Sequence, residues 1–429
     1  MPKLTRRNAL ILAGIGALGV AALRPGENGE PQDVYFQNIA AALRKAQLQR
    51  PTLVVDKQAL KHNITRLKQH LPEQMAYRVV AKSLPSVNLI ESVLRETQTQ
   101  HLMVFHQPFI EALAKQVPDA DQLLGKPMPV SQAALTLESL AKEELNDFVP
   151  SRDIQWLVDS NERLREYAAL AEGRGETLNV NLEIDVGLHR GGFSDQAELQ
   201  TALQFLRDSQ SLKFTGFMGY EPHIVKVPEL AGGGDPAFES AQQIYRDALE
   251  LARKVWNGKL DESSLTLNTG GSGTFQMYKD RQTPANELAM GSGLVMPTSF
   301  DMPTLSDHKP ASFIATPVLK ASKGIRVPGL EWAAPALEAW NPNWQRSYFT
   351  YGGYWKATPV SPKGLSPNAI YGRSTNQEML NGSDDTGLSV GDTVFLRPQQ
   401  SEFVFLQFGD IAVYDNGDIT ELWPVLQNS

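Results

Sequence analysis

Residues 77–83 read Tyr77-Arg78-Val79-Val80-Ala81-Lys82-Ser83, an apolar run that ends in a lysine and a polar turn. A short apolar run of this kind is typical of a buried strand in a parallel sheet. Lys82 would then lie where the strand leaves the core and opens into a cleft. Loss of hydration at such a position lowers the pKa of an amine and makes it nucleophilic, so Lys82 is a candidate Schiff-base lysine. The alternative, a surface lysine that ends a strand, is the common case for any lysine considered alone.

Strand-like and helix-like stretches alternate along most of the chain. The β-rich runs are Leu53–Val55, Tyr77–Ala81, Leu102–Phe105, Ile154–Val158, Leu178–Val186, Phe214–Met218, Ser264–Leu267 and Glu287–Met290. Amphipathic stretches separate most of them, which predicts a parallel sheet, and about eight repeats that close on themselves predict a TIM-type (β/α)8 barrel. The alternative is an open doubly wound sheet, but no Gly-x-Gly-x-x-Gly motif opens a helix after the first strand to support it.

The pattern changes past about Leu305. Residues 306–429 show short β runs between turn-rich stretches, and Asn416-Gly417 between two such runs is a tight-hairpin signal. We therefore expect an α/β chain with three parts. Residues 1–30 would be an export signal, residues 31–305 the barrel, and residues 306–429 a C-terminal all-β domain.

The N-terminus has the features of an export signal. Arg6 and Arg7 follow Thr5 and precede an apolar segment, residues 9–23, that is too short for a comfortable membrane span. The paired arginines resemble the twin-arginine type, although Ala9 stands where that motif usually has phenylalanine. We expect a periplasmic protein. An ordinary secretory signal and an uncleaved inner-membrane anchor are the alternatives.

Composition narrows the class of function. With 429 residues and 41% hydrophobic content, the chain has room for a large domain and a smaller one. A net charge of -8 gives no sign of the excess positive charge that binds nucleic acid, so small-molecule chemistry is the better expectation. The sequence contains no cysteine, which excludes disulfides, thiolate metal ligands and a cysteine nucleophile.

Polar and glycine-rich residues follow the predicted strands one after another. They are Lys82, His106, Asp159, Asp185, His189, Arg190, Tyr220, Glu221, His223, Gly270–Thr274 and Gly291–Gly293. In a (β/α)8 barrel all these positions fall on the C-terminal rim, where such enzymes keep their active sites. A whole set of groups on one face supports a catalytic lysine far better than the lysine alone.

Two glycine-rich segments predict a phosphate site. In residues 269–274 the glycines let successive N–H groups point into a concavity, and Ser272 and Thr274 add hydroxyls. Gly291-Ser292-Gly293 follows the next strand and would close the cradle from the other side, at the usual place for a phosphate in barrels. Either segment alone is more often just a tight turn. A nucleophilic lysine and a phosphate cradle in one cleft suggest pyridoxal 5'-phosphate (PLP).

Several motifs occur in the order seen in the fold-type III PLP enzymes. They are Pro51-Thr52-Leu53-Val54-Val55-Asp56, Val80-Ala81-Lys82, Glu183-Ile184-Asp185-Val186-Gly187-Leu188-His189-Arg190-Gly191-Gly192, Gly219-Tyr220-Glu221-Pro222-His223 and Asn268-Thr269-Gly270-Gly271-Ser272-Gly273-Thr274. The chain most resembles the D-threonine aldolase and D-serine dehydratase branch, which shares its barrel with alanine racemase. The resemblance covers roughly Pro51 to the C-terminus, and it implies a PLP enzyme.

The resemblance also implies roles for single residues. Lys82 would bond the cofactor, Arg190 would lie beside its phenolic oxygen or the substrate, and Tyr220 would lie near its ring. The phosphate would be held by Ser272, Gly273 and Gly291. Without the resemblance, Arg190 is as readily a salt-bridge partner of Asp185 or Glu183, and Tyr220 a core aromatic with a satisfied hydroxyl. Alanine racemase has an arginine on the pyridine nitrogen where this chain has Ala289, which favours the aldolase and dehydratase branch.

The chain departs from that branch at its metal site. The family's ligands come from a short segment of the β domain, and here Gln400 and Glu402 stand in their place. An amide and one carboxylate make a poor zinc site, so we expect that the family's metal has been lost. A harder ion held by Glu402 and water molecules is the alternative. Without the family's metal, a side chain must act at the substrate's β-hydroxyl. His223 is our first candidate, with His106 and His189 as alternatives, although any single histidine is more often structural.

We therefore expect a PLP-dependent lyase, similar to D-threonine aldolase or D-serine dehydratase, that acts on a D-amino acid or a β-hydroxy-amino acid. Three alternatives remain open: an amino-acid racemase, a PLP-binding protein without turnover, and a PLP-independent barrel aldolase that uses Lys82 directly. The resemblance also implies a homodimer.

Overall fold

The computed structural model describes residues 24–427 except 229, 231, 326, 327 and 330. The arginine pair and the apolar segment of the predicted export signal therefore lie outside the described residues. Within the described part of the chain, no helix combines the length and the apolar character needed to cross a membrane.

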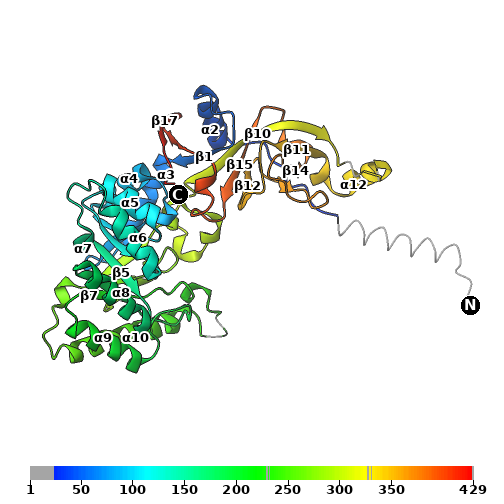
Figure 1. The fold of residues 1–429 in the computed structure, drawn as a ribbon. Helices are drawn as coiled ribbons and strands as arrows, with labels where there is room; N and C mark the ends of the chain where they lie inside the picture. Colours follow the sequence, from blue (N-terminus) through cyan, green and yellow to red (C-terminus); the bar gives the residue numbers. More distant parts are fainter. Residues whose placement is uncertain (1–23, 229, 231, 326–327, 330, 428–429) are drawn as a thin grey trace, which may run out of the picture. The chain divides into compact units, whose positions relative to one another are not determined.

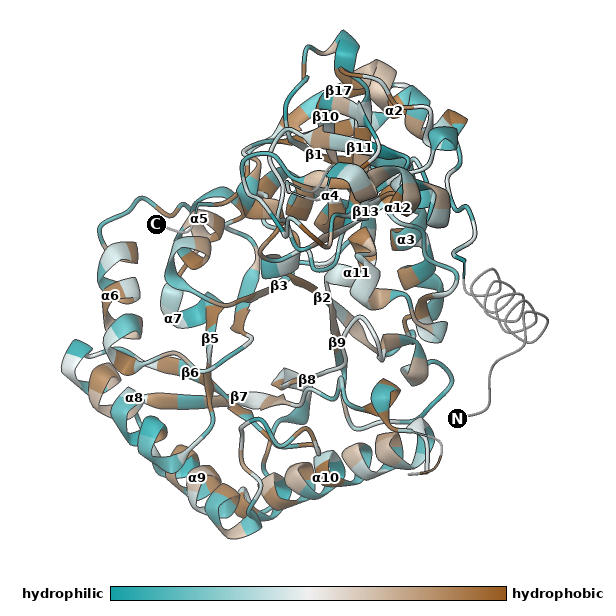
Figure 2. Ribbon diagram, turned by 90° about the vertical axis from the view of Figure 1, so that its right-hand side faces the viewer, coloured by the Kyte–Doolittle hydropathy of each residue, from teal (hydrophilic) through white to brown (hydrophobic). Residues whose placement is uncertain are grey.

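Eight parallel strands close into a barrel, as the sequence predicts. Figure 2 shows these strands as a ring with the helices outside it. The ring closes where Tyr77 pairs with Leu288 and Val79 with Met290. The strands are β2 (Ala76–Val80), β3 (His101–Val104), β4 (Asp121–Leu124), β5 (Ile154–Val158), β6 (Leu178–Glu183), β7 (Leu212–Met218), β8 (Thr266–Thr269) and β9 (Glu287–Met290).

Helices follow the strands and pack around the barrel (Figure 1). Their apolar faces are buried; α3, for example, buries Leu60, Ile64 and Leu67 and begins at Asp56, whose side chain accepts hydrogen bonds from two N–H groups of its first turn. The helices are α3 (Lys57–His70), α4 (Val87–Thr97), α5 (Gln107–Gln116), α6 (Val130–Leu140), α7 (Pro150–Asp153), α8 (Asn161–Arg174), α9 (Gln196–Asp208), α10 (Gly234–Val255) and α11 (Ser292–Val295).

Two strand assignments from the sequence need correction. The run at Leu53–Val55 forms β1 (Thr52–Asp56), which joins the other sheet and is not a barrel strand. Its place is taken by β4, which the sequence analysis missed because the strand begins with two polar residues, Asp121 and Gln122. Asp121 pairs with Arg78, at 2.5 Å from its Nη1 atom, so a charged residue is suitable there.

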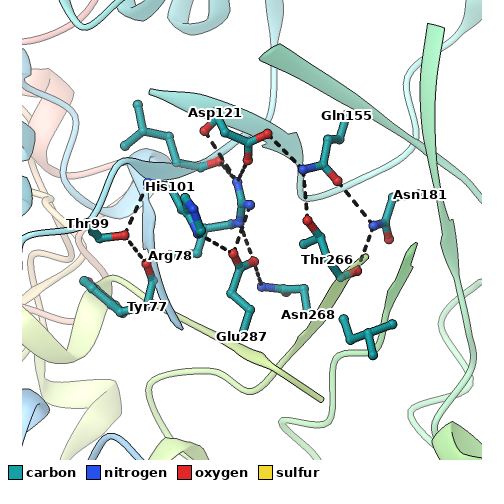
Figure 3. A network of polar contacts seen from close by, with 12 residues as sticks. Tyr77, Arg78, Thr99, His101, Asp121, Gln155, Asn181, Thr266, Asn268 and Glu287 are labelled. Atoms are coloured by element: carbon teal, nitrogen blue, oxygen red, sulfur yellow. Dashed lines mark hydrogen bonds and ion pairs between the residues drawn. The ribbon is translucent and has the colours of Figure 1, made fainter. Parts of the chain in front are cut away.

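A buried polar network crosses the barrel (Figure 3). The Arg78 side chain is 1% exposed and donates to both carboxylate oxygens of Glu287, at 2.5 and 3.0 Å. His101 Nδ1 lies 2.7 Å from Glu287, and Asn268 donates to the same carboxylate. Burial, the largest single effect, raises the pKa of Glu287, but the charge of Arg78 and the hydrogen bonds from His101 and Arg78 together outweigh it and lower that pKa to about 2. The barrel is therefore held by an internal ion pair as well as by apolar packing.

A separate nine-stranded sheet follows the order β13-β14-β11-β10-β1-β16-β17, with β12 and β15 attached at one side. This mixed sheet confirms that the C-terminal part is rich in strands. Its strands beyond β1 are β10 (Ser312–Lys323), β11 (Arg346–Thr350), β12 (Ala357–Ser361), β13 (Ser366–Pro367), β14 (Met379–Gly382), β15 (Thr393–Pro398), β16 (Ile411–Asp415) and β17 (Asp418–Trp423). The remaining helices of the described chain are α2 (Val34–Lys45) and α12 (Ala334–Trp340).

The chain divides into two compact units. One contains Phe313–Pro398, Asn416–Ile419 and the described residues up to Val54. The other contains the barrel, Val55–Ser312, together with Gln399–Asp415 and the described residues from Thr420 onward. The segment that holds Gln400 and Glu402 therefore belongs to the same unit as Lys82. The domain bounds drawn from the sequence stay a prediction.

Candidate active site

Lys82 lies directly after β2, in a single helical turn formed by Ala81–Ser83. Its side chain is 43% exposed, and its Nζ atom lies 4.5 Å from the centre of the Phe105 ring and 4.0 Å from Glu402 Oε1. Burial lowers the pKa of Lys82; the Glu402 carboxylate opposes this, while the positive charges of Arg190 and Lys126 add to it. The net lowering favours the neutral, nucleophilic amine.

Glu402 is tied to the lysine's surroundings by serine hydroxyls. Ser83 donates a hydrogen bond to Glu402 Oε1 at 3.2 Å, and Ser292 donates to Ser83 at 3.0 Å. Ser401 Oγ lies 3.2 Å from Ser292 Oγ. These bonds join the ends of β2 and β9 to the segment that carries Glu402. Glu402, which the resemblance places at a metal-ligand position of the family, thus lies beside the candidate catalytic lysine.

Arg190 and Tyr220 lie against each other, while their roles beside a cofactor stay a prediction. The guanidinium carbon of Arg190 lies 5.1 Å from the centre of the Tyr220 ring, which is a cation–π contact. Asp185 instead pairs with His189, whose Nδ1 atom lies 2.9 Å from Asp185 Oδ2. Burial raises the pKa of Glu183, and the Arg190 charge partly offsets this. Within the described chain Arg190 forms no ion pair, so the guanidinium has donors left for a ligand.

The two glycine-rich segments form one surface. The N–H of Gly293 donates to Ser272 Oγ at 2.9 Å, which joins the loop after β8 to the loop after β9. The N–H groups of Gly271, Ser272 and Gly273 make no hydrogen bond with any described residue. Three free donors in succession suit an anion such as a phosphate.

Close packing explains the glycines on this surface. A Cβ atom on Gly271 would lie 2.9 Å from Tyr220 Cε2, and one on Gly291 would lie 2.8 Å from Ser83 Cβ. Gly270 adopts a φ of +81°, in the left-handed region that favours glycine. The cradle therefore needs small residues at its inner positions, and the residues present fit a PLP phosphate held by Ser272, Gly273 and Gly291.

The three candidate histidines differ in their surroundings. His223 follows β7, its Nδ1 atom is buried without a hydrogen-bond partner in the described chain, and burial lowers its pKa, with His189 adding to the effect. His189 is exposed and paired with Asp185. His106 begins α5 and stacks on Phe109 at 4.2 Å between ring centres. No described contact joins any of the three to Lys82, so the catalytic role of His223 stays a prediction.

Sequence reasoning did not foresee the contacts that several residues make around Lys82. Ser83, Ser292 and Ser401 form the hydroxyl chain to Glu402, and Phe105 and Lys126 act on the lysine directly. Ser83 follows Lys82 and Ser292 follows Gly291, two residues that the sequence analysis placed in the site, and this adjacency was a signal that could have indicated their role. Their contact with each other joins positions 209 residues apart and could not be read from spacing.

Comparison with known proteins agrees with this geometry. Residues 55–298, more than half of the chain, match the family model described as alanine racemase, N-terminal domain. Among curated proteins, no sequence matches the chain.

Solved structures share the fold at low sequence identity. D-threonine aldolase from Filomicrobium marinum has a TM-score of 0.66 and 16% identity, over 88% of this chain and 95% of that one. D-threo-3-hydroxyaspartate dehydratase from Delftia sp. HT23 has a TM-score of 0.66 and 15% identity, over 88% and 98%. Alanine racemase from Bacillus anthracis with bound L-Ala-P has a TM-score of 0.65 and 15% identity, also over 88% and 98%. The chain belongs to the alanine racemase N-terminal domain family, within the fold-type III PLP enzymes.

Proposed function

We propose that this protein is a PLP-dependent lyase that acts on a D-amino acid or a β-hydroxy-amino acid. One observation carries the proposal: a lysine with a lowered pKa lies at the end of a barrel strand, in a family of PLP enzymes. The glycine-rich surface after β8 and β9 supports it, because its free N–H groups fit the cofactor's phosphate. Structures of a D-threonine aldolase and a D-threo-3-hydroxyaspartate dehydratase share the fold, which is why we place a lyase first.

When bound, PLP supplies an electron sink that stabilises negative charge at the substrate's α-carbon. The chain's own residues hold and orient the reactants. Lys82 Nζ would bond the resting cofactor, and after the substrate's amine displaces it the freed Lys82 amine could act as a base. In a dehydratase that amine would accept the proton from the α-carbon, which requires the neutral form that its lowered pKa favours; in an aldolase, where the Cα–Cβ bond breaks instead, the protonated amine would return a proton to the α-carbon. Arg190, held against the Tyr220 ring, offers a fixed fork of donors to the cofactor's phenolic oxygen or to the substrate's carboxylate.

The reaction at the β-carbon depends on what replaces the family's metal. We propose that Gln400 and Glu402 hold no zinc, since an amide and a carboxylate are not the ligands that zinc prefers. The Glu402 carboxylate instead lies 4.0 Å from Lys82 Nζ and accepts a hydrogen bond from the Ser83 hydroxyl, which positions both side chains. We assign proton transfer at the substrate's β-hydroxyl to His223. In an aldolase its imidazole, kept neutral by the lowered pKa, would accept the hydroxyl proton. In a dehydratase the imidazole would have to be protonated first, so that it could donate the proton with which the hydroxyl leaves as water.

Amino-acid racemisation is the second candidate. The family model is that of alanine racemase, and the alanine racemase of Bacillus anthracis shares the fold. Racemisation needs a second acid or base on the opposite face of the substrate. The arginine of true alanine racemases is replaced by Ala289, which is why we place racemisation behind the lyase.

A substrate panel separates these candidates. Purified protein loaded with PLP is incubated with D- and L-amino acids, including β-hydroxy-amino acids. An aldolase gives an aldehyde and glycine, a dehydratase gives a keto acid and ammonia, and a racemase gives the opposite enantiomer. A loaded protein that converts none of the panel, while still binding PLP through Lys82, would support a PLP-binding protein without turnover.

We also propose that the protein is exported to the periplasm and works as a homodimer. Fractionation of cells that produce the full chain tests the location, and replacement of Arg6 and Arg7 by lysine should block export by a twin-arginine route. Sedimentation at several concentrations tests the dimer. A chain that stays in the cytoplasm, or that sediments as a monomer throughout, would contradict these proposals.

A further inference from the structure

Glu221 is a carboxylic acid at the centre of the phosphate-binding region, and it is completely buried. It follows β7, yet its hydrogen bonds go to the loop after β8. Thr269 Oγ1 donates to Oε2 at 3.0 Å, and the N–H of Gly270 donates to the same oxygen at 3.3 Å. Thr274 Oγ1 donates to Oε1 at 2.9 Å. One side chain thus binds both ends of the loop that runs from residue 269 to residue 274.

This carboxyl has no cationic partner in the part of the chain that the structure describes. Burial raises its pKa, and hydrogen bonds from Thr274, Tyr278, Thr269 and Gly270 oppose that effect. A buried carboxyl without a counter-ion is costly unless donors surround it. A carboxylate would also repel an anion bound to the neighbouring loop, so the position of Glu221 calls for a structural reason.

The pattern of bonds in the loop provides that reason. Glu221 takes the donors at the two ends, and the N–H groups of Gly271, Ser272 and Gly273 between them stay free. The carbonyl of Gly271 accepts the N–H of Thr274, which closes a tight turn in the middle. With its ends fixed, the loop keeps a single shape with three successive donors unpaired.

We propose that Glu221 is a positioning residue that shapes the cradle and so sets the preference of the site for the phosphorylated form of the cofactor. The inference rests on the proposed function, because it takes PLP as the ligand. Glu221 does not touch the cofactor in this account; it acts through the N–H groups of the loop. Lys82 is not bonded to Glu221, so the reaction of its amine with an aldehyde is independent of the loop.

The test compares PLP with pyridoxal, which has the same aldehyde and lacks the phosphate. Dissociation constants for both are measured from visible absorbance with the full-length wild type and with Glu221→Ala. Loss of the several hydrogen bonds that fix the loop typically costs enough to weaken binding about tenfold or more. We expect Glu221→Ala to lose at least about tenfold in affinity for PLP and to stay within about twofold of the wild type for pyridoxal. Equal losses for both ligands, or no loss for either, would overturn the inference.

Two further variants make the result specific. Glu221→Gln keeps one acceptor oxygen, so its affinity for PLP should lie between that of the wild type and that of Glu221→Ala. Tighter PLP binding by Glu221→Gln would show that the charge opposes the phosphate and would contradict the proposal. Thr274→Val removes one donor and serves if Glu221→Ala does not fold; it should also weaken PLP selectively, and an unchanged ratio of the two affinities would refute the proposal.

A matched control tests the effect of losing any buried carboxylate. Glu378 is also buried, at 1% exposure, and it pairs with Arg373 and accepts the N–H of Tyr354 in the other compact unit. Glu378→Gln should leave the ratio of PLP to pyridoxal affinity unchanged. If the wild type bonds neither PLP nor pyridoxal, the proposed function itself is refuted. If the wild type binds both and the Glu221 variants lose affinity for both equally, only the inference about Glu221 is refuted.

Discussion

Replacement of Arg78 by methionine tests the polar interior of the barrel. The variant keeps much of the side chain's volume but removes the charge that stabilises the Glu287 carboxylate, which is 3% exposed. His101 and Asn268 would be the partners left to that carboxylate. Breaking a buried ion pair by removing one partner typically costs about 3–5 kcal/mol.

The pKa of Glu287 gives a second measure of the same interaction. Its net fall from 4.5 to about 2, to which burial and His101 contribute as well as Arg78, corresponds to roughly 3 kcal/mol of stability and is therefore of the same order as the first figure. The folded-state pKa lies below the unfolded one, so this stability is present above pH 4.5 and is lost as the pH falls toward 2. The penalty of Arg78→Met should therefore be largest at neutral pH and should shrink as Glu287 becomes protonated.

Urea unfolding followed by circular dichroism measures both effects. Arg152→Met is the control, because Arg152 is 64% exposed in its pair with Asp153 and such surface pairs contribute about 1 kcal/mol or less. We expect Arg78→Met to lose about 3–5 kcal/mol of unfolding free energy at pH 7 and clearly less at pH 3. A loss no larger than that of Arg152→Met, or one that does not change with pH, would refute this reasoning.

Three further predictions concern the site. Glu402→Gln should lower the pKa of Lys82 further, because the carboxylate raises it, so the amine should react with PLP at lower pH; a shift to higher pH in a titration of the visible band would contradict this. Arg190→Lys should raise the KM for the amino acid about tenfold, since lysine lacks the planar fork that stacks on Tyr220; an unchanged KM in steady-state assays would count against that role. Chelators should leave activity intact, and activity that is abolished by EDTA and restored by Zn²⁺ or Mn²⁺ would show that the expected loss of the metal is wrong.

The strong alternation of strands and helices made the barrel predictable. Strands with three or more apolar residues, such as Glu287–Met290 and Ile154–Val158, were placed at their observed bounds. The failure at β4 has a physical cause: the barrel interior is polar, so Asp121 and Gln155 point into it and bind each other. β4 has only four residues, and the first two, Asp121 and Gln122, are polar, so it lacks the apolar run that identified the other strands of this interior.

The other misplacement has a different cause. The run that became β1 is fully buried and apolar, as a barrel strand would be. Hydrophobicity shows that a segment is buried, but it does not show which sheet receives it. Its pairing is decided by contacts with segments hundreds of residues away, which local sequence does not encode.

The candidate site was predictable at the level of strand ends. Lys82, Arg190, Tyr220 and the glycine-rich segments could be found because each follows a strand. The contacts between them depend on residues far apart in the sequence, such as Ser83 with Glu402. Glu221 was visible as a polar residue on the rim, but only the fold shows that it binds the neighbouring loop.

The central claim, that Lys82 bonds PLP, is tested most directly by the visible absorbance of the purified protein with PLP added. Lys126→Ala is the control, since Lys126 also acts on the site through its charge and lies outside the proposed bond. The account predicts a visible band in the wild type and in Lys126→Ala that is lost in Lys82→Ala. A band that survives unchanged in Lys82→Ala, or a wild type that stays colourless with PLP, would contradict it.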